Sequence, residues 1–83
     1  MDTQALRKQA HDLDITVWVG KSGIDPVEPE LDNQLKDTDL VKVKFLRAAQ
    51  GGTTVAELAD DLANRVNAHV IETRGNTGVL YRR

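Results

Sequence analysis

Residues 18–24, WVGKSGI, combine glycines, a lysine and a hydroxyl at a spacing that could bind phosphate. Gly-Lys-Ser is how a nucleotide-binding P-loop ends, where backbone N–H groups and the lysine hold the phosphates. Gly-x-x-Gly is also the core of a loop that clamps the sugar-phosphate chain in some RNA-binding modules. A plain strand-to-helix connection would use the same glycines for geometry alone, so the rest of the chain must decide.

The nucleotide-binding alternative requires Gly-x-x-x-x-Gly-Lys-[Ser/Thr], and Ile15 occupies the position of the first glycine. Ile15 begins the run ITVWV, whose β-branched and aromatic residues predict a strand over residues 15–19. Ser22 is the only serine, and no His–Asp pattern supports it as a nucleophile. We therefore expect no nucleotide hydrolysis and no enzyme.

Residues 40–46, LVKVKFL, alternate apolar and basic residues and predict a second strand. The alternation places Lys42 and Lys44 on one face, as solvated groups or as contacts for phosphate. Arg74 and Arg82 lie in a predicted C-terminal hairpin, where they could meet on adjacent strands. Lys21 lies near both lysines if strands 15–19 and 40–46 are neighbours.

Trp18 is the only tryptophan, and strand alternation places it with Thr16, opposite Ile15, Val17 and Val19. It could stack on a base beside the loop. Large aromatic side chains are more often mostly buried, so packing beneath a neighbouring helix is the interpretation we favour.

The elements that position these residues follow from periodicity. A first helix is predicted over 3–13, with Leu6, Ala10 and Leu13 on one stripe. A second helix is predicted to start at Asp25-Pro26 or at Glu28. A third is predicted from Thr54 to about residue 66. Strands 69–74 and 78–82 flank the turn signal Gly75-Asn76. The order α-β-α-β-α-β-β predicts an α+β fold with a small mixed four-stranded sheet. We expect helices on one face and, if the other is open, the two lysines there.

Bulk composition excludes several classes of protein. The chain has 83 residues, a net charge of −2 and no cysteine, so one domain over 1–83 without disulfide or zinc-thiolate sites is expected. No 18-residue apolar run exists and the N-terminus has no apolar h-region, so neither a transmembrane helix nor a secretory signal is expected. The lack of cysteine fits a reducing cytoplasm, which is the expected location. His11 and His69 are isolated, so no metal site is predicted. Residues 25–39 carry a local charge of −5, which leaves +3 elsewhere.

The chain resembles the CRM domain of the YhbY-like RNA-binding family in three stretches, which occur in the order VWVGKSGI, LVKVKFL and TGVLYRR. In that family a strand runs into a Gly-x-x-Gly loop, a helix and an LIKVK-type strand follow, and a VLYR-like strand closes the domain. The resemblance spans essentially the whole chain. It implies a fold akin to the C-terminal domain of translation initiation factor three.

The resemblance also implies RNA binding without catalysis or cofactor, and association of a single-domain prokaryotic member with ribosomal RNA or large-subunit precursors during ribosome assembly. The alternative is a protein-interaction module whose acidic segment 25–39 contacts a basic partner such as a ribosomal protein. Neither a membrane nor a small-molecule substrate is expected. The candidate RNA-binding residues are Gly20, Lys21, Ser22, Gly23, Lys42, Lys44, Arg74, Arg82 and Trp18.

Overall fold

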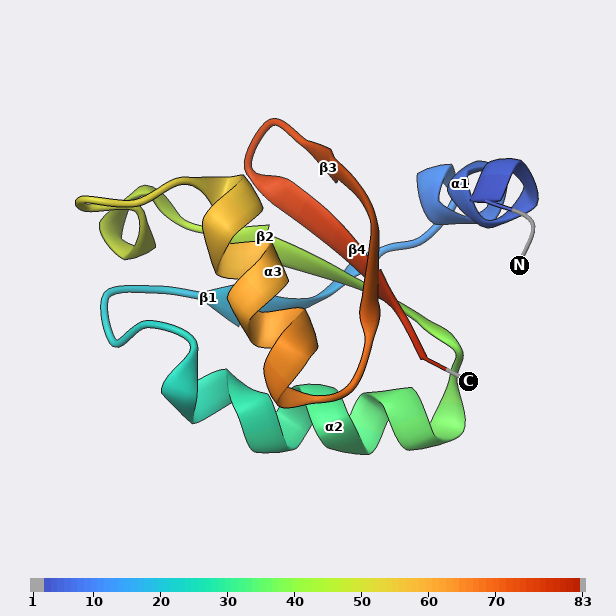
Figure 1. The fold of residues 1–83 in the computed structure, drawn as a ribbon, viewed down its shortest axis with the longest axis horizontal. Helices are drawn as coiled ribbons and strands as arrows, with labels where there is room; N and C mark the ends of the chain where they lie inside the picture. Colours follow the sequence, from blue (N-terminus) through green and yellow to red (C-terminus); the bar gives the residue numbers. More distant parts are fainter. Residues whose placement is uncertain (1–2, 83) are drawn as a thin grey trace.

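The structure is a computed structural model that describes residues 3–82. Its elements are α1 (Thr3–His11), β1 (Ile15–Val19), η1 (Asp25–Val27), α2 (Glu28–Asp37), β2 (Leu40–Phe45), η2 (Arg47–Ala49), α3 (Val55–Arg65), β3 (His69–Arg74) and β4 (Thr77–Tyr81). The predicted α+β class and element order are confirmed (Figure 1). Both expected starts of the second helix are present, as a 3-10 turn from Asp25 followed by the α-helix from Glu28.

The four strands form one mixed sheet in the order β1-β2-β4-β3. β1 and β2 are parallel neighbours, as a strand–helix–strand unit allows, whereas β4 pairs antiparallel with both β2 and β3. β2 therefore lies inside the sheet, and β1 and β3 form its edges.

One face of the sheet builds the main core against α2 and α3. The alternation of β2 buries Val41, Val43 and Phe45 completely or nearly so. The buried residues of this core are Val17, Val19, Ile24, Leu31, Leu35, Val41, Val43, Phe45, Ala59, Leu62, Ala63, Val66 and Leu80. Val55 and Leu58 of α3 are only partly buried at the margin of this core.

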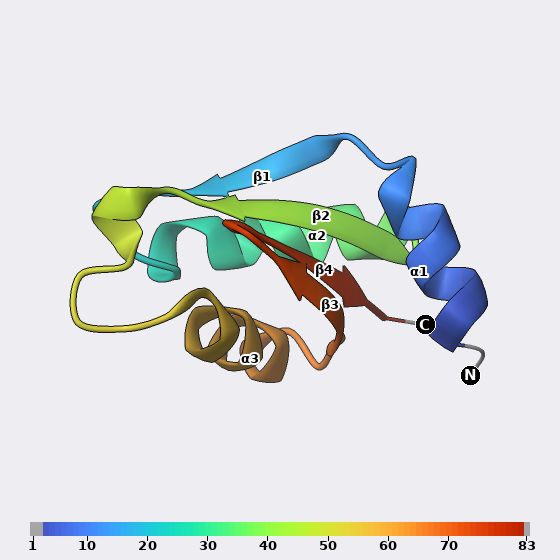
Figure 2. The same cartoon turned by 90° about the horizontal axis from the view of Figure 1, so that it is seen from above.

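The second face is covered at one end by α1. Ala10 is buried against Leu40, Ile71 and Val79, so the predicted apolar stripe of this helix is confirmed. The expectation that the helices share one face is wrong, because α1 lies at the end of the sheet, apart from α2 and α3 (Figure 2). No helix within residues 3–82 lies over the rest of this face.

Each edge strand contains a bulge that changes which side chains share a face. The register shift in β1 makes Thr16 an extra residue, and its Oγ1 donates a hydrogen bond to Gln34 Oε1 of α2 at 2.6 Å. Trp18 therefore shares its face with Ile15, and the predicted grouping with Thr16 is wrong. In β3, Ile71 is the extra residue.

Gly78 in β4 allows α3 to pack closely on the sheet. A Cβ atom at this position would lie 3.3 Å from Phe45 Cε2 and 3.4 Å from Ala59 Cβ. Any larger side chain must displace the helix or the phenylalanine.

We predict that Gly78→Val lowers the free energy of unfolding by about 1–3 kcal/mol, because overpacking strains the core. Chemical denaturation followed by circular dichroism measures this change. Gly51→Val is the matched control, since a Cβ at Gly51 meets nothing within 4 Å, and it should change stability by less than about 0.5 kcal/mol. Equal losses in the two variants would contradict the packing argument.

Candidate nucleic-acid interface

A row of polar and aromatic residues crosses the uncovered part of the second face. Trp18 pairs with Lys44, Lys44 with Thr77, and Thr77 with Arg74, so the row spans all four strands. We call these four residues the cross-strand row. In antiparallel pairs such as Lys44–Thr77 and Thr77–Arg74, facing side chains lie about 4.5–5.5 Å apart at Cβ, so these three residues are close neighbours.

The Gly20–Gly23 loop follows β1 at the end of the sheet where this row lies. The N–H of Gly23 donates to the carbonyl of Gly20 at 3.0 Å, and Gly23 has a φ of 79°, a conformation that favours glycine. The turn holds Lys21 and Ser22 at an exposed tip. Within residues 3–82 neither of these two makes a hydrogen bond or ion pair, so both remain available to an external group.

The loops at this end of the sheet are joined by hydrogen bonds. Leu46 N–H donates to Val19 O at 2.8 Å, and Phe45 N–H donates to Asn76 O at 2.7 Å. The amide of Gln50 donates to Phe45 O at 2.9 Å and to Asn76 Oδ1 at 3.2 Å. The loop after β1, the 3-10 turn after β2 and the β3–β4 hairpin are thereby fixed to one another.

Lys42 and Lys44 both lie on the second face, as their alternation predicted. The condition for Lys21 to approach them is met, since β1 and β2 are neighbours. Lys44 pairs with Trp18 near the end of β1, whereas Lys42 pairs with Ile15 at its start, so Lys44 is the lysine nearer the loop.

Arg47, which the sequence reasoning missed, begins the 3-10 turn at the same end of the sheet and is exposed. The signal that could have identified it is its position directly after the basic strand.

Trp18 is 53% exposed, so the expectation that it packs beneath a helix is wrong. It lies on an edge strand, on the face that α2 and α3 do not cover, and α1 reaches only the other end of the sheet. Leu46, which is 40% exposed, follows β2 at the same end and contributes a second accessible apolar side chain. An accessible indole beside Lys44, whose side chain has no partner among residues 3–82, suits stacking on a base.

Arg82 belongs to a different part of the molecule. Arg74 pairs with Thr77 next to the turn, whereas Arg82 follows Tyr81 at the far end of the hairpin, so the expectation that the two arginines meet is wrong. Arg82 Nη1 donates to Asp32 Oδ1 at 2.6 Å and to Val66 O at 2.8 Å, and Nη2 donates to Asp32 O at 2.9 Å. These bonds tie the end of β4 to α2 and to the end of α3.

The acidic segment 25–39 is partly neutralised within the molecule. Arg65 of α3 pairs with Asp25 and, at 3.6 Å, with Glu28. The hydrogen bond to Asp25 raises the pKa of Arg65. The hydrogen bond from Arg82 lowers the pKa of Asp32 below its ordinary value of 3.8, and Lys36 acts in the same direction. These acids therefore help to hold α2 to the rest of the fold.

No group of three or more His, Cys, Asp or Glu side chains in residues 3–82 is arranged to hold a metal ion. None of the described helices has the length and apolarity that crossing a membrane requires.

The fold and this surface define a small α+β domain with a Gly-x-x-Gly loop beside an open, basic sheet face. The sequence profile of the CRS1 / YhbY (CRM) domain matches residues 2–82, so the chain belongs to that family. The resemblance inferred from the three sequence stretches is confirmed.

A relative in Methanocaldococcus jannaschii, named Probable RNA-binding protein MJ0652, is 42% identical over 77 residues. The match covers 93% of this chain but only 58% of the length of that relative. The solution structure of SAV1595 from Staphylococcus aureus, described as a candidate RNA-binding protein, superimposes with a TM-score of 0.80 at 28% identity. That match covers 98% of this chain and 83% of the other, and it confirms the fold.

We predict that the Asp32–Arg82 pair contributes stability that acid removes. Because the folded pKa of Asp32 is lowered, this contribution is fully present above about pH 3.8, the ordinary value, and is lost as pH falls through the folded pKa. Asp32→Asn should therefore be less stable than the wild type at pH 7, and this difference in stability should narrow only below about pH 3.8. Denaturant unfolding across the pH range measures the gap. Asp60→Asn, at an exposed helix position, is the control; a pH-independent gap for Asp32→Asn would refute the prediction.

Proposed function

We propose that this chain is a non-catalytic RNA-binding domain that holds the sugar-phosphate backbone at its Gly20–Gly23 loop and along the cross-strand row. The observation that carries the proposal is the gathering of Lys21, Lys44 and Arg74 at one end of the sheet, beside an exposed Trp18. Within residues 3–82 none of these three cationic side chains has an internal hydrogen-bond or ion-pair partner. The names of the M. jannaschii and S. aureus proteins support the same assignment.

Each part of this surface supplies a different interaction. The exposed tip of the loop brings backbone N–H groups, an ammonium and the Ser22 hydroxyl to a phosphate, and Gly20 and Gly23 let the two chains approach closely. Lys44 continues the positive surface along the sheet, where phosphate contacts position the RNA without reading its sequence. Trp18 offers a π-face to any base, which suits unpaired nucleotides.

The RNA that we propose is ribosomal RNA or a precursor of the large ribosomal subunit, bound in the cytoplasm during ribosome assembly. The support is the resemblance to single-domain prokaryotic members of the family. In this proposal residues 1–83 act as one CRM domain that needs no cofactor. A net charge of −2 does not oppose RNA binding, because the acidic groups concentrate in segment 25–39.

The alternative, a protein-interaction module that uses segment 25–39, has less support. Asp25, Glu28 and Asp32 in that segment already pair with arginines of the same chain. A basic partner would have to compete with these internal bonds. We therefore leave the segment out of the proposed binding surface, together with Arg82.

We predict that the double variant Lys21→Ala, Lys44→Ala weakens binding to a ribosomal RNA fragment and makes it less dependent on salt. Each lost phosphate contact should lower the slope of log affinity against log salt by about 0.7–0.9. Fluorescence polarisation at several salt concentrations measures both quantities. The control variant Lys8→Ala, Lys36→Ala removes the same charge from α1 and α2. Unchanged affinity and slope in the first variant would reject the proposed surface.

We predict that Trp18→Ala weakens RNA binding by about 1–3 kcal/mol if one base stacks on the indole. The salt slope should equal that of the wild type, because no charge is lost. As Trp18 is the only tryptophan, its fluorescence in the wild type should also change on addition of RNA. Wild-type affinity in the variant, with no fluorescence change in the parent, would rule out stacking.

A further inference from the structure

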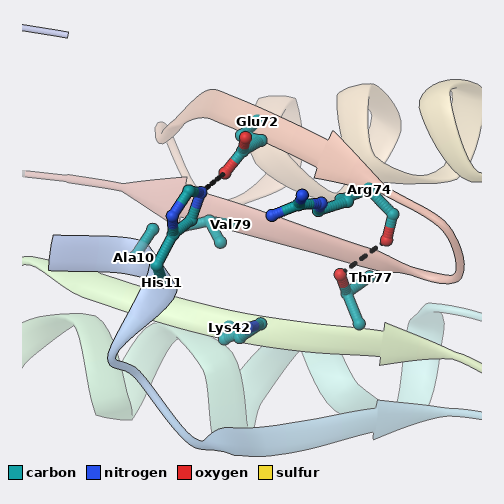
Figure 3. Close-up of a pocket in the computed structure, with 7 residues that line it drawn as sticks. All are labelled: Ala10, His11, Lys42, Glu72, Arg74, Thr77 and Val79. Carbon is teal, nitrogen blue, oxygen red and sulfur yellow. Dashed lines mark hydrogen bonds and ion pairs between the residues drawn. The ribbon is translucent and has the colours of Figure 1, made fainter. Parts of the chain in front are cut away.

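A pocket of about 170 Å³ lies on the second face between α1 and the sheet (Figure 3). Its lining residues are Ala10, His11, Lys42, Glu72, Arg74, Thr77 and Val79. Drug-sized ligands use pockets of about 300–1,000 Å³, so this one suits a smaller group. It adjoins the Arg74–Thr77 part of the cross-strand row and extends away from the Gly20–Gly23 loop, since Lys42 and Val79 form the next pair on the same face of β2 and β4.

The acidic side chain that lines the pocket has a partner, whereas the lysine and the arginine that line it have none within residues 3–82. Within residues 3–82 the ammonium of Lys42 and the guanidinium of Arg74 have no hydrogen bond or ion pair. The carboxylate of Glu72 instead lies 3.5 Å from His11 Nε2 on α1. Figure 3 shows Glu72 directed toward His11, while the Arg74 side chain extends over the sheet toward that pair. Two unpaired cations therefore line a pocket whose single acid already has a neighbour.

The composition of the pocket selects among ligands. A lone carboxylate beside two cations does not suit a metal ion, which needs several oxygen or nitrogen ligands. A purely apolar ligand would leave the cations desolvated and unpaired. A phosphate group meets both cations with its oxygens, while the Thr77 hydroxyl at the edge of the pocket donates to the Arg74 carbonyl oxygen at 2.8 Å. Charge-assisted bonds between a cation and a phosphate are the stronger class of hydrogen bond.

We propose that this pocket is a second phosphate subsite, distinct from the Gly20–Gly23 loop, that takes a phosphate group of the bound RNA. The inference rests on the proposed function. This phosphate is either a terminal phosphate of the RNA or an internal phosphodiester linkage. Beyond the pocket, α1 covers the sheet through Ala10. A single RNA strand that crosses the sheet from the Gly20–Gly23 loop must therefore end or turn at the pocket.

The test uses the full chain and short single-stranded RNAs of one sequence that end in a 5′-phosphate, a 3′-phosphate or hydroxyls only. Lys42→Gln and Arg74→Gln should each weaken binding about twofold to tenfold relative to the wild type, as loss of a partly exposed charged contact implies. Lys8→Gln, on the exposed surface of α1, is the matched control. Glu72→Gln should tighten binding, because it removes the only negative charge from the pocket while keeping a polar side chain opposite His11.

The pattern across the RNAs identifies the source of the phosphate. If the terminus enters, the wild type prefers one phosphorylated RNA, and Lys42→Gln and Arg74→Gln abolish that preference. If an internal linkage enters, both variants weaken all three RNAs equally and reduce the salt slope. If both variants behave like Lys8→Gln while Lys21→Ala, Lys44→Ala still weakens binding, the subsite is refuted together with any RNA contact by Arg74, and the proposed function stands on Lys21 and Lys44. Absence of RNA binding by the wild type would instead refute the proposed function.

Discussion

The double pairing of β2 is the constraint on which the rest of the molecule depends. β2 hydrogen-bonds to β1 on one side and β4 on the other, so its backbone register cannot shift without breaking both ladders. Its two-residue alternation sends Val43 and Phe45 into the core. A slip of one residue would exchange the two faces and bury Lys42 and Lys44 without partners, at a cost of several kcal/mol for each charge. The basic surface is therefore fixed by the same pairing that builds the core.

The remaining elements determine how much of that surface stays accessible. α1 uses Ala10 to cover the Leu40 end of the second face, and the hydrogen bonds of Gln50 hold the turn after β2 against the β3–β4 hairpin at the other end. What lies between is the cross-strand row and the pocket. The sheet thus divides its second face into a packed part, which stabilises the fold, and an uncovered part, which is available to a ligand.

Local patterns in the sequence predicted the elements well, because periodicity and turn residues act over a few positions. The alternation of residues 40–46 placed Lys42 and Lys44 correctly, and the hairpin turn was found at Gly75-Asn76. The predictions that were wrong depend on contacts between distant residues. Arg82 has a partner 50 positions away in Asp32, and no local pattern reveals that pair. The exposure of Trp18 depends on where α1 packs, and that requires the tertiary structure.

Two groups of basic residues in the described part of the chain differ in what compensates their charge. Arg65 and Arg82 have carboxylate partners within the fold, so their charges add to its cohesion. Lys21, Lys44 and Arg74 gather at one end of the sheet without partners among residues 3–82, so they repel one another and oppose the compact state. Packing does not require that arrangement, because an uncharged polar side chain would fit an exposed face equally well. An external anion would remove the repulsion, and for this reason we propose the binding surface from the unpaired group rather than from the total charge.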